Sequence, residues 1–234
     1  MRGVVDAGAT EVTVNDAHNT MRNIKPLDLH PAAWLVSGKA KPLSMMEGIA
    51  DGYDCAMFIG YHSRIGEPRG VLGHTYNPGS VIQQLEINDV VVGETALNGY
   101  LASHFGVPLL LVSGDTVACE EAEATFLGCT TVATKEGRGK FSAKSPHPSV
   151  CRARIEEAAR VALTTTVQIS KPRIPVTFKL NLASSAMADM CCLVPGVKRI
   201  TGTCVLWQSE TYLDAYRLFL VACAMCRTAT DRVY

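Results

Sequence analysis

Short apolar runs alternate with segments of helical spacing through most of the first 135 residues. Runs with the apolar or β-branched character of strands lie at residues 10–16, 54–62, 108–115 and 129–134. Segments with helical spacing lie at residues 42–52, 94–105 and 116–126, and residues 82–94 alternate like a hairpin that turns at Asn88–Asp89. This alternation predicts an α/β fold, with a mostly parallel sheet flanked by helices.

The pattern changes after residue 135. A polar loop at 136–149 is followed by five segments. They are a long helix at 150–168, a strand at 175–182, a short helix, a strand at 201–207 and a final helix at 209–227. We therefore predict two domains, an α/β domain at residues 1–135 and a smaller α+β unit at residues 136–234.

Polar side chains follow three of the predicted strands where each strand ends. Asp16 and His18 follow the first strand, His62 follows the second, and Asp115 ends the third. Open parallel sheets bind ligands at the carboxyl ends of their strands. The sequence therefore predicts a site at this edge.

Two residues extend this candidate site. His74 lies in the glycine-rich loop after His62, where glycines allow a ligand to approach the backbone closely. Glu94 begins the helix at 94–105, where a carboxylate would also stabilise the helix dipole without any further function. Imidazoles and carboxylates without a thiolate suit zinc or a similar metal in hydrolysis, and two metals that share a carboxylate would activate water together.

Composition narrows the class of protein. The 22 basic and 22 acidic residues give a net charge of zero, which argues against a general nucleic-acid partner. No apolar run is long enough to predict a membrane span, and the N-terminus does not resemble a signal peptide. The nine cysteines mostly lie in apolar surroundings. We therefore expect reduced thiols and a cytoplasmic location.

Seven segments together resemble one protein family, the bacterial D-aminopeptidases encoded in dipeptide-transport operons. The segments are, in chain order, "TEVTVNDAHNTMRNI", "SGKAKPLSMMEGI", "FIGYHSR", "GVLGH", "INDVVVGETALNGY", "LLLVSGD" and "TGTCVLWQSETYLDAYRLF". The resemblance extends from about residue 2 to residue 229. It implies a binuclear zinc metallopeptidase that removes N-terminal D-amino acids, such as D-Ala, from short peptides and assembles into ring-shaped homo-oligomers.

The resemblance also implies roles for individual residues. His18, His62 and Glu94 match zinc ligands of the family, and His74 matches a histidine that is assigned to catalysis beside the metals. In this interpretation, residues 1–135 are the metal-binding domain.

One family motif is not found. Members begin with a strand that ends in Asp-x-Glu-Gly, whose carboxylates hold and bridge the two zinc ions, and this sequence contains no such motif. We therefore expect the first strand of the family fold to be missing. The alternative to a zinc aminopeptidase is a catalytically inactive relative that oligomerises or binds peptide.

Overall fold

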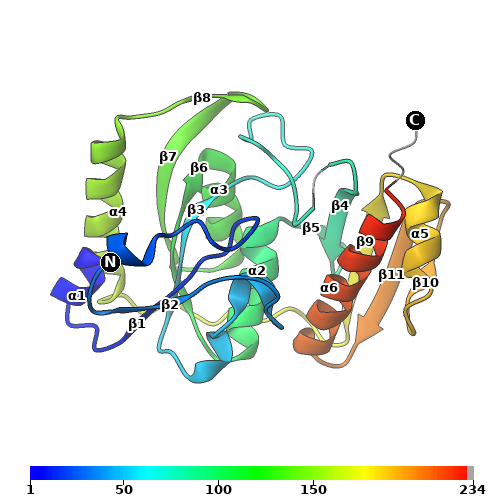
Figure 1. Cartoon of the computed structure of the whole chain (residues 1–234), viewed down its shortest axis with the longest axis horizontal. Coiled ribbons are helices and arrows are strands. Elements are labelled where there is room, and N and C mark those ends of the chain that lie inside the picture. The colour runs from blue at the N-terminus through cyan, green and yellow to red at the C-terminus, as the bar shows by residue number, and fades with distance from the viewer. Residues whose placement is uncertain (78, 231–234) are drawn as a thin grey trace.

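A sheet of three parallel strands and one antiparallel strand organises the N-terminal lobe (Figure 1). The computed structural model describes residues 1–77 and 79–230. The strand order is β3 (Ala56–Tyr61), β6 (Leu109–Asp115), β7 (Thr130–Gly139) and β8 (Ser142–Lys144). Every residue of the central strand β6 is buried, as expected for a parallel strand that is covered on both faces.

Helices cover both faces of this sheet, and the apolar residues of β3 show how. Met57 packs with α1 (Arg2–Asp6) and α4 (Pro148–Ala162), whereas its neighbour Phe58 packs in the larger core with α2 (Glu94–His104) and α3 (Thr116–Thr125). Consecutive residues of a strand point to opposite faces, so these two pairs of helices lie on opposite sides of the sheet. The predicted α/β class is confirmed.

An antiparallel sheet forms the C-terminal lobe. Its strand order is β10 (Lys198–Arg199), β11 (Cys204–Ser209), β9 (Val176–Leu182), β4 (Ile82–Ile87) and β5 (Val90–Val91). The helices α5 (Ser185–Cys191) and α6 (Tyr212–Thr228) pack on it. Leu97 of α2, Phe178 of β9 and Phe219 of α6 belong to one continuous core, which joins the two lobes.

The strands of the C-terminal lobe come from both sides of residue 135. β4 and β5 precede this residue but pair in the sheet of β9, and β7 runs through it. The reason is the hairpin at 82–91, whose apolar residues complete the antiparallel sheet and not the parallel one. The division into domains at residues 1–135 and 136–234 therefore stays a prediction. The antiparallel sheet contains strands from both of these ranges.

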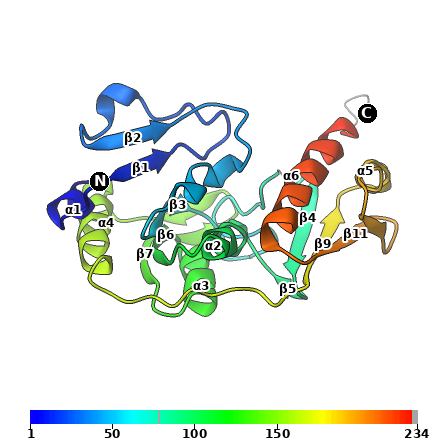
Figure 2. The same cartoon turned by 90° about the horizontal axis from the view of Figure 1, so that it is seen from below.

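The first predicted strand does not join the central sheet. β1 (Val12–Asn15) pairs in parallel with β2 (Ala33–Val36), a strand that we did not predict, and the two form a separate sheet (Figure 2). In the described part of the chain, no strand connects β1 to β3 by backbone hydrogen bonds. Our expectation that the strands carrying His18, His62 and Asp115 share one edge was therefore wrong for the first of them.

Two other local predictions were wrong. Residues 42–52 form two short 3₁₀ turns, Ser44–Met46 and Ile49–Asp51, because Gly48 between them adopts a left-handed φ of 93° that ends a helix. The loop predicted at 136–149 contains the end of β7 and the strand β8, which pair as a hairpin. None of the helices in the described residues has the length and apolar character needed to cross a membrane.

Candidate metal centre

A glycine-rich loop after β3 brings two histidines to the carboxyl edge of the sheet. Nδ1 of His62 lies 2.9 Å from the carbonyl oxygen of Ser63, and Nδ1 of His74 lies 2.8 Å from that of Leu72. A carbonyl oxygen only accepts hydrogen bonds, so each Nδ1 carries the proton. Both rings therefore present an unprotonated Nε2 when they are neutral, which is the form that binds metals.

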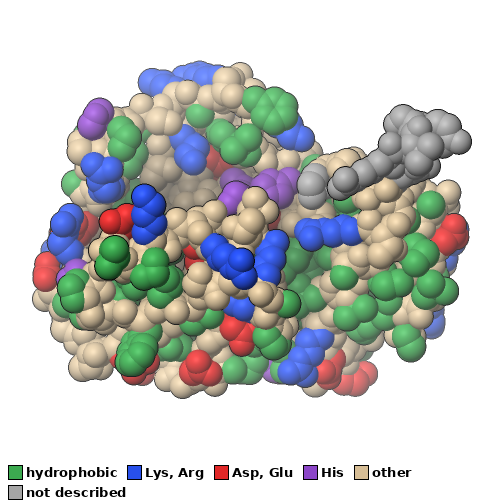
Figure 3. Space-filling view, viewed as in Figure 1, with side chains coloured by type: hydrophobic (Ala, Val, Ile, Leu, Met, Phe, Trp, Pro, Cys, Tyr) green, Lys and Arg blue, Asp and Glu red, His purple; other side chains and the backbone are tan. Residues whose placement is uncertain are grey.

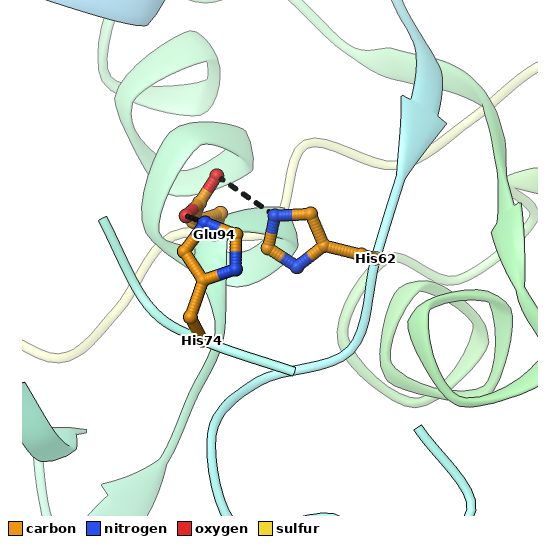
Figure 4. A group of neighbouring side chains, drawn as sticks. All are labelled: His62, His74 and Glu94. Atoms are coloured by element: carbon orange, nitrogen blue, oxygen red, sulfur yellow. Dashed lines mark ion pairs between the residues drawn. The ribbon is translucent and has the colours of Figure 1, made fainter. Parts of the chain in front are cut away.

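Glu94 faces these two nitrogens from the first turn of α2. Its carboxylate is buried, and its Oε1 accepts a hydrogen bond of 2.6 Å from the backbone amide of Tyr76. Oε2 lies 3.8 Å from Nε2 of His62, and Oε1 lies 3.8 Å from Nε2 of His74 (Figure 4). In the described residues, these histidines are its only partners within ion-pair distance.

The three side chains form one compact group. Each offers a ligand atom, and these atoms all lie within 4.8 Å of one another. The imidazole rings stack with centroids 4.1 Å apart. The side chains of His62 and His74 are 20% and 31% exposed, so the group is open on one side. In the space-filling view, histidine side chains gather beside a hollow in the surface (Figure 3).

Asp115 fixes the loop that carries both histidines. This residue is fully buried, and its Oδ2 accepts hydrogen bonds from the amides of Ser63 (3.0 Å) and Val71 (2.8 Å). Its Oδ1 accepts from Ala118 and caps α3. One carboxylate thus holds a residue beside His62 and a residue near His74 against the end of β6.

Glu121 supports Glu94 in a similar way from α3. Its Oε1 accepts hydrogen bonds from the amides of Gly93 (2.8 Å) and Ala96 (3.1 Å), at the N-terminus of α2. Burial raises the pKa of Glu121, although these two amides oppose the shift. A Cβ atom on Gly93 would lie 2.7 Å from Oε2 of Glu121 and 2.9 Å from Cβ of Arg64, so a side chain at this position would force both neighbours to shift.

The donor set fits a zinc ion. Two neutral imidazoles and a carboxylate that leave a position open are the ligand set of many catalytic zinc sites. The buried Glu94 carboxylate has no lysine or arginine partner among the described residues, and a cation at this position would neutralise it. The Nε2–oxygen separations of 3.8 Å need only a small contraction around an ion with bonds of about 2.0–2.2 Å.

The structure does not bring His18 into this group. His18 is exposed on the loop after β1, where its carbonyl oxygen accepts hydrogen bonds from Asn23 and Met21. The group contains His74 in addition to the predicted ligands His62 and Glu94. The roles of all four residues stay predictions, because proximity alone does not distinguish a ligand from a catalytic group.

Asp16 explains the polar end of the first strand without any metal. Its Oδ2 accepts hydrogen bonds from the amides of Asn23 (2.5 Å) and Ile24 (2.7 Å), and its Oδ1 accepts from the side chain of Asn23. Burial would raise the pKa of Asp16, but these hydrogen bonds and the nearby Lys41 outweigh it and lower the pKa. Asp16 thus stabilises the turn that follows β1.

Sequence reasoning missed Glu121 and the supporting role of Asp115. Asp115 carried a signal, because an aspartate between a buried strand and a helix is a favoured helix N-cap. Glu121 carried none, since its contact depends on how α3 packs beside α2.

Comparisons with known proteins point to one family. The sequence pattern of the D-aminopeptidase family matches residues 1–221. A D-aminopeptidase of Bacillus subtilis (strain 168) is 37% identical over 220 residues, which cover 92% of this chain and 79% of that protein. The structure of the Zn-dependent D-aminopeptidase DppA from Bacillus subtilis, described as a self-compartmentalizing protease, superposes with a TM-score of 0.93 at 34% identity, covering 98% of this chain and 84% of that one. The chain belongs to the D-aminopeptidase family.

Proposed function

We propose that this chain is a zinc-dependent aminopeptidase that removes N-terminal D-amino acids, such as D-Ala, from short peptides. The observation that carries the proposal is the convergence of His62, His74 and Glu94 at an open edge of the sheet. Family membership and the zinc dependence of DppA support the choice of metal and reaction.

We assign His62 and Glu94 as metal ligands and His74 as the catalytic residue. Zinc bound there would supply a Lewis acid that polarises the scissile carbonyl and favours ionisation of water. The hydrogen bond from Nδ1 of His74 to Leu72 fixes the orientation of the ring, so Nε2 points into the group. From this position His74 can stabilise the tetrahedral species or deliver a proton to the leaving amine.

His18 remains a proposed ligand of a second zinc ion. It follows a strand whose end is held by Asp16 and by the ammonium of Lys41, which donates to the carbonyl oxygen of Asp16. Bringing His18 to the group would require the loop at 17–24 to move relative to these contacts. A zinc titration that compares His18→Ala with the unchanged protein tests this assignment directly.

Self-association into a ring-shaped homo-oligomer is also proposed. The description of DppA as self-compartmentalizing supports this assembly. Large apolar side chains that are mostly exposed, Leu27 (98%), Trp34 (70%) and Phe141 (81%), are suitable contacts between subunits. We further propose a cytoplasmic location, which the nine unpaired cysteines support.

Hydrolysis of D-Ala-D-Ala and of the anilides of D-Ala and L-Ala tests the function. We expect cleavage of the D substrates, loss of activity with a chelator and recovery on addition of zinc. Activity that is indifferent to the chelator would contradict the proposal.

The second candidate function is a non-catalytic member that binds peptide or oligomerises. The observation that favours it is the position of His18 outside the group, which leaves three converging side chains for a centre that the family resemblance expects to hold two metals. Metal content discriminates between the two functions: two tightly held zinc ions per chain would exclude the non-catalytic candidate.

A further inference from the structure

Two buried thiols contact each other in the C-terminal lobe. Cys191 ends α5, and Cys226 lies in the last turn of α6. Their Sγ atoms are 3.0 Å apart, and both side chains have an exposed fraction of 0%. All nine cysteines lie in the described residues, and within this set only Cys191 and Cys226 are in hydrogen-bonding contact with each other.

We propose that Cys191 and Cys226 are an oxidation site, at which a peroxide converts the two thiols into a reversible disulfide that joins α5 to α6.

The geometry is close to that of the product. A disulfide has an S–S bond of about 2.05 Å, so the two sulfur atoms need to approach by only about 1 Å. Cys191 lies on the neighbouring helix at the level of the last turns of α6, and its Sγ also lies 3.6 Å from the carbonyl oxygen of Ala222. The two helices are packed against each other, so the approach is a short one between neighbouring side chains.

The two thiols have different roles in the reaction. The Cys191 thiol donates its own proton toward the carbonyl oxygen of Ala222 at 3.6 Å, so in the contact between the two sulfurs Cys226 is the donor. This hydrogen bond lowers the pKa of Cys191 and raises that of Cys226. Cys191 is therefore the thiol that ionises and attacks the peroxide first. The neighbouring Cys223 is not suited to this role, because burial raises its pKa well above the usual value.

The reaction is balanced with hydrogen peroxide as the oxidant. The Cys191 thiolate attacks one peroxide oxygen, the O–O bond breaks, and the departing hydroxide becomes water, leaving a sulfenic acid. The sulfur of Cys226 then attacks the sulfur of Cys191, and the hydroxyl leaves as water with the Cys226 proton. The two sulfurs together lose two electrons, which reduce one peroxide to two waters.

The oxidation site is linked to the candidate metal centre by a short chain of contacts. Arg227, the residue after Cys226, donates from Nε to Oδ1 of the buried Asn77 at 2.6 Å. Tyr76, the residue before Asn77, donates a hydrogen bond from its backbone amide to Oε1 of Glu94. A covalent bond at Cys226 would hold the last turn of α6, and with it the loop at 75–77, more firmly.

The principal experiment maps disulfides in the folded wild-type protein. The protein is treated with hydrogen peroxide, the remaining thiols are alkylated, and peptides are analysed by mass spectrometry before and after reduction. We expect a linked Cys191–Cys226 peptide and a fall from nine to seven alkylated thiols, with full recovery on reduction. Absence of this peptide, or a comparable yield of links through Cys204, would overturn the proposal.

Two variants sharpen the assignment. In Cys226→Ser the thiol that contacts Cys191 is absent, so we expect the Cys191 sulfenic acid to persist and to be trapped by dimedone that is present as the protein is unfolded. The matched control Cys204→Ser removes a buried cysteine of β11 and is expected to leave the Cys191–Cys226 link unchanged. The wild-type map decides the proposal even if Cys226→Ser does not fold.

Hydrogen exchange tests the link to the metal centre independently of any enzymatic activity. Oxidation is expected to slow amide exchange of the 75–77 loop several-fold in the wild-type protein and to leave it unchanged in Cys226→Ser. Equal exchange of the oxidised and reduced wild-type proteins would overturn the coupling, while the disulfide map would still decide the oxidation site.

Discussion

Nε2 of His62 and Nε2 of His74 approach the two different oxygens of the Glu94 carboxylate at the same distance, 3.8 Å. The rings lie almost face to face, and their Nδ1 atoms are both turned away toward backbone carbonyls. The buried carboxylate of Glu94 has no lysine or arginine partner among the described residues, and a cation held between it and the two Nε2 atoms would neutralise its charge. The arrangement is therefore that of a preorganised cation site.

Glu94→Gln should abolish tight zinc binding while preserving the fold. The glutamine side chain keeps the shape of the glutamate and can still accept the hydrogen bond from the backbone of Tyr76, but it carries no negative charge. Even the loss of a group that only orients a ligand typically costs about 10–100-fold in metal affinity, so we expect a larger loss here. Zinc titration measures the change.

The matched control for this variant is Glu210→Gln, an exposed carboxylate in the C-terminal lobe. It should bind zinc like the wild-type protein. Since Glu94→Gln also removes a buried charge, its metal-free form should melt at the same temperature as the wild-type protein or higher. Unchanged zinc affinity in Glu94→Gln would contradict the assigned site.

His74→Gln should separate catalysis from metal binding. If His74 acts on the substrate, its removal lowers kcat by about 10²–10⁴-fold while zinc content stays near the wild-type value. His62→Gln is the comparison, because it removes a proposed ligand and should lower the zinc content itself. A loss of zinc in His74→Gln equal to that in His62→Gln would make His74 a third ligand and leave the catalytic role unassigned.

Local patterns predicted most of the elements because their signals lie within a few residues. The hairpin turn at Asn88–Asp89 is one example: both residues adopt the positive φ values, 51° and 67°, that this pair of residue types tolerates. The segment at 42–52 failed because its apolar spacing suggested a helix, whereas Gly48 is used in a left-handed conformation. β2 was missed because Ala33–Val36 is a short continuous apolar run, which periodicity alone does not assign to a strand, whereas β1, which is equally short, begins with three β-branched residues.

The site was predictable to the extent that it follows strand and helix ends. His62 and Glu94 occupy such ends, and the loop after β3 returns His74 to them. His18 was expected at the same place because its strand was assumed to share the sheet of β3. Strand neighbours are set by long-range pairing, which no local pattern encodes, and β1 pairs with β2 instead.

Asp115→Asn should weaken both the fold and the metal site. The carboxylate accepts hydrogen bonds from three amides, and an asparagine would turn one NH₂ group toward donors. A buried hydrogen bond to a charged group contributes roughly 1.5–3 kcal/mol, so we expect the free energy of unfolding to fall by about 3 kcal/mol.

Urea unfolding and zinc titration check this prediction together. Because Asp115 orients the loop and does not belong to the group of His62, His74 and Glu94, the zinc affinity of the folded variant should fall by about 10-fold, less than in Glu94→Gln. Asp54→Asn, an exposed residue before β3, should change neither quantity. A destabilised variant with fully retained zinc affinity would show that Asp115 supports the fold alone.

Asp16 should make the stability of the β1–β2 region depend on acid pH. Its pKa in the folded protein lies below the ordinary value of 3.8, so its stabilisation is fully present above about pH 4. This stabilisation is lost as the pH falls through the lower, folded-state pKa, because protonation then removes the charge that accepts hydrogen bonds from Asn23 and Ile24.

The free energy of unfolding of Asp16→Asn should therefore be roughly 1–3 kcal/mol lower than that of the wild-type protein at pH 7. This difference should shrink toward pH 3, since below its ordinary pKa of 3.8 the unfolded-state carboxyl takes up a proton that the folded state still resists. Urea unfolding at both pH values measures the effect, with Asp28→Asn as an exposed control in the same loop. A difference that stays constant between the two pH values would show that Asp16 acts through its shape and not its charge.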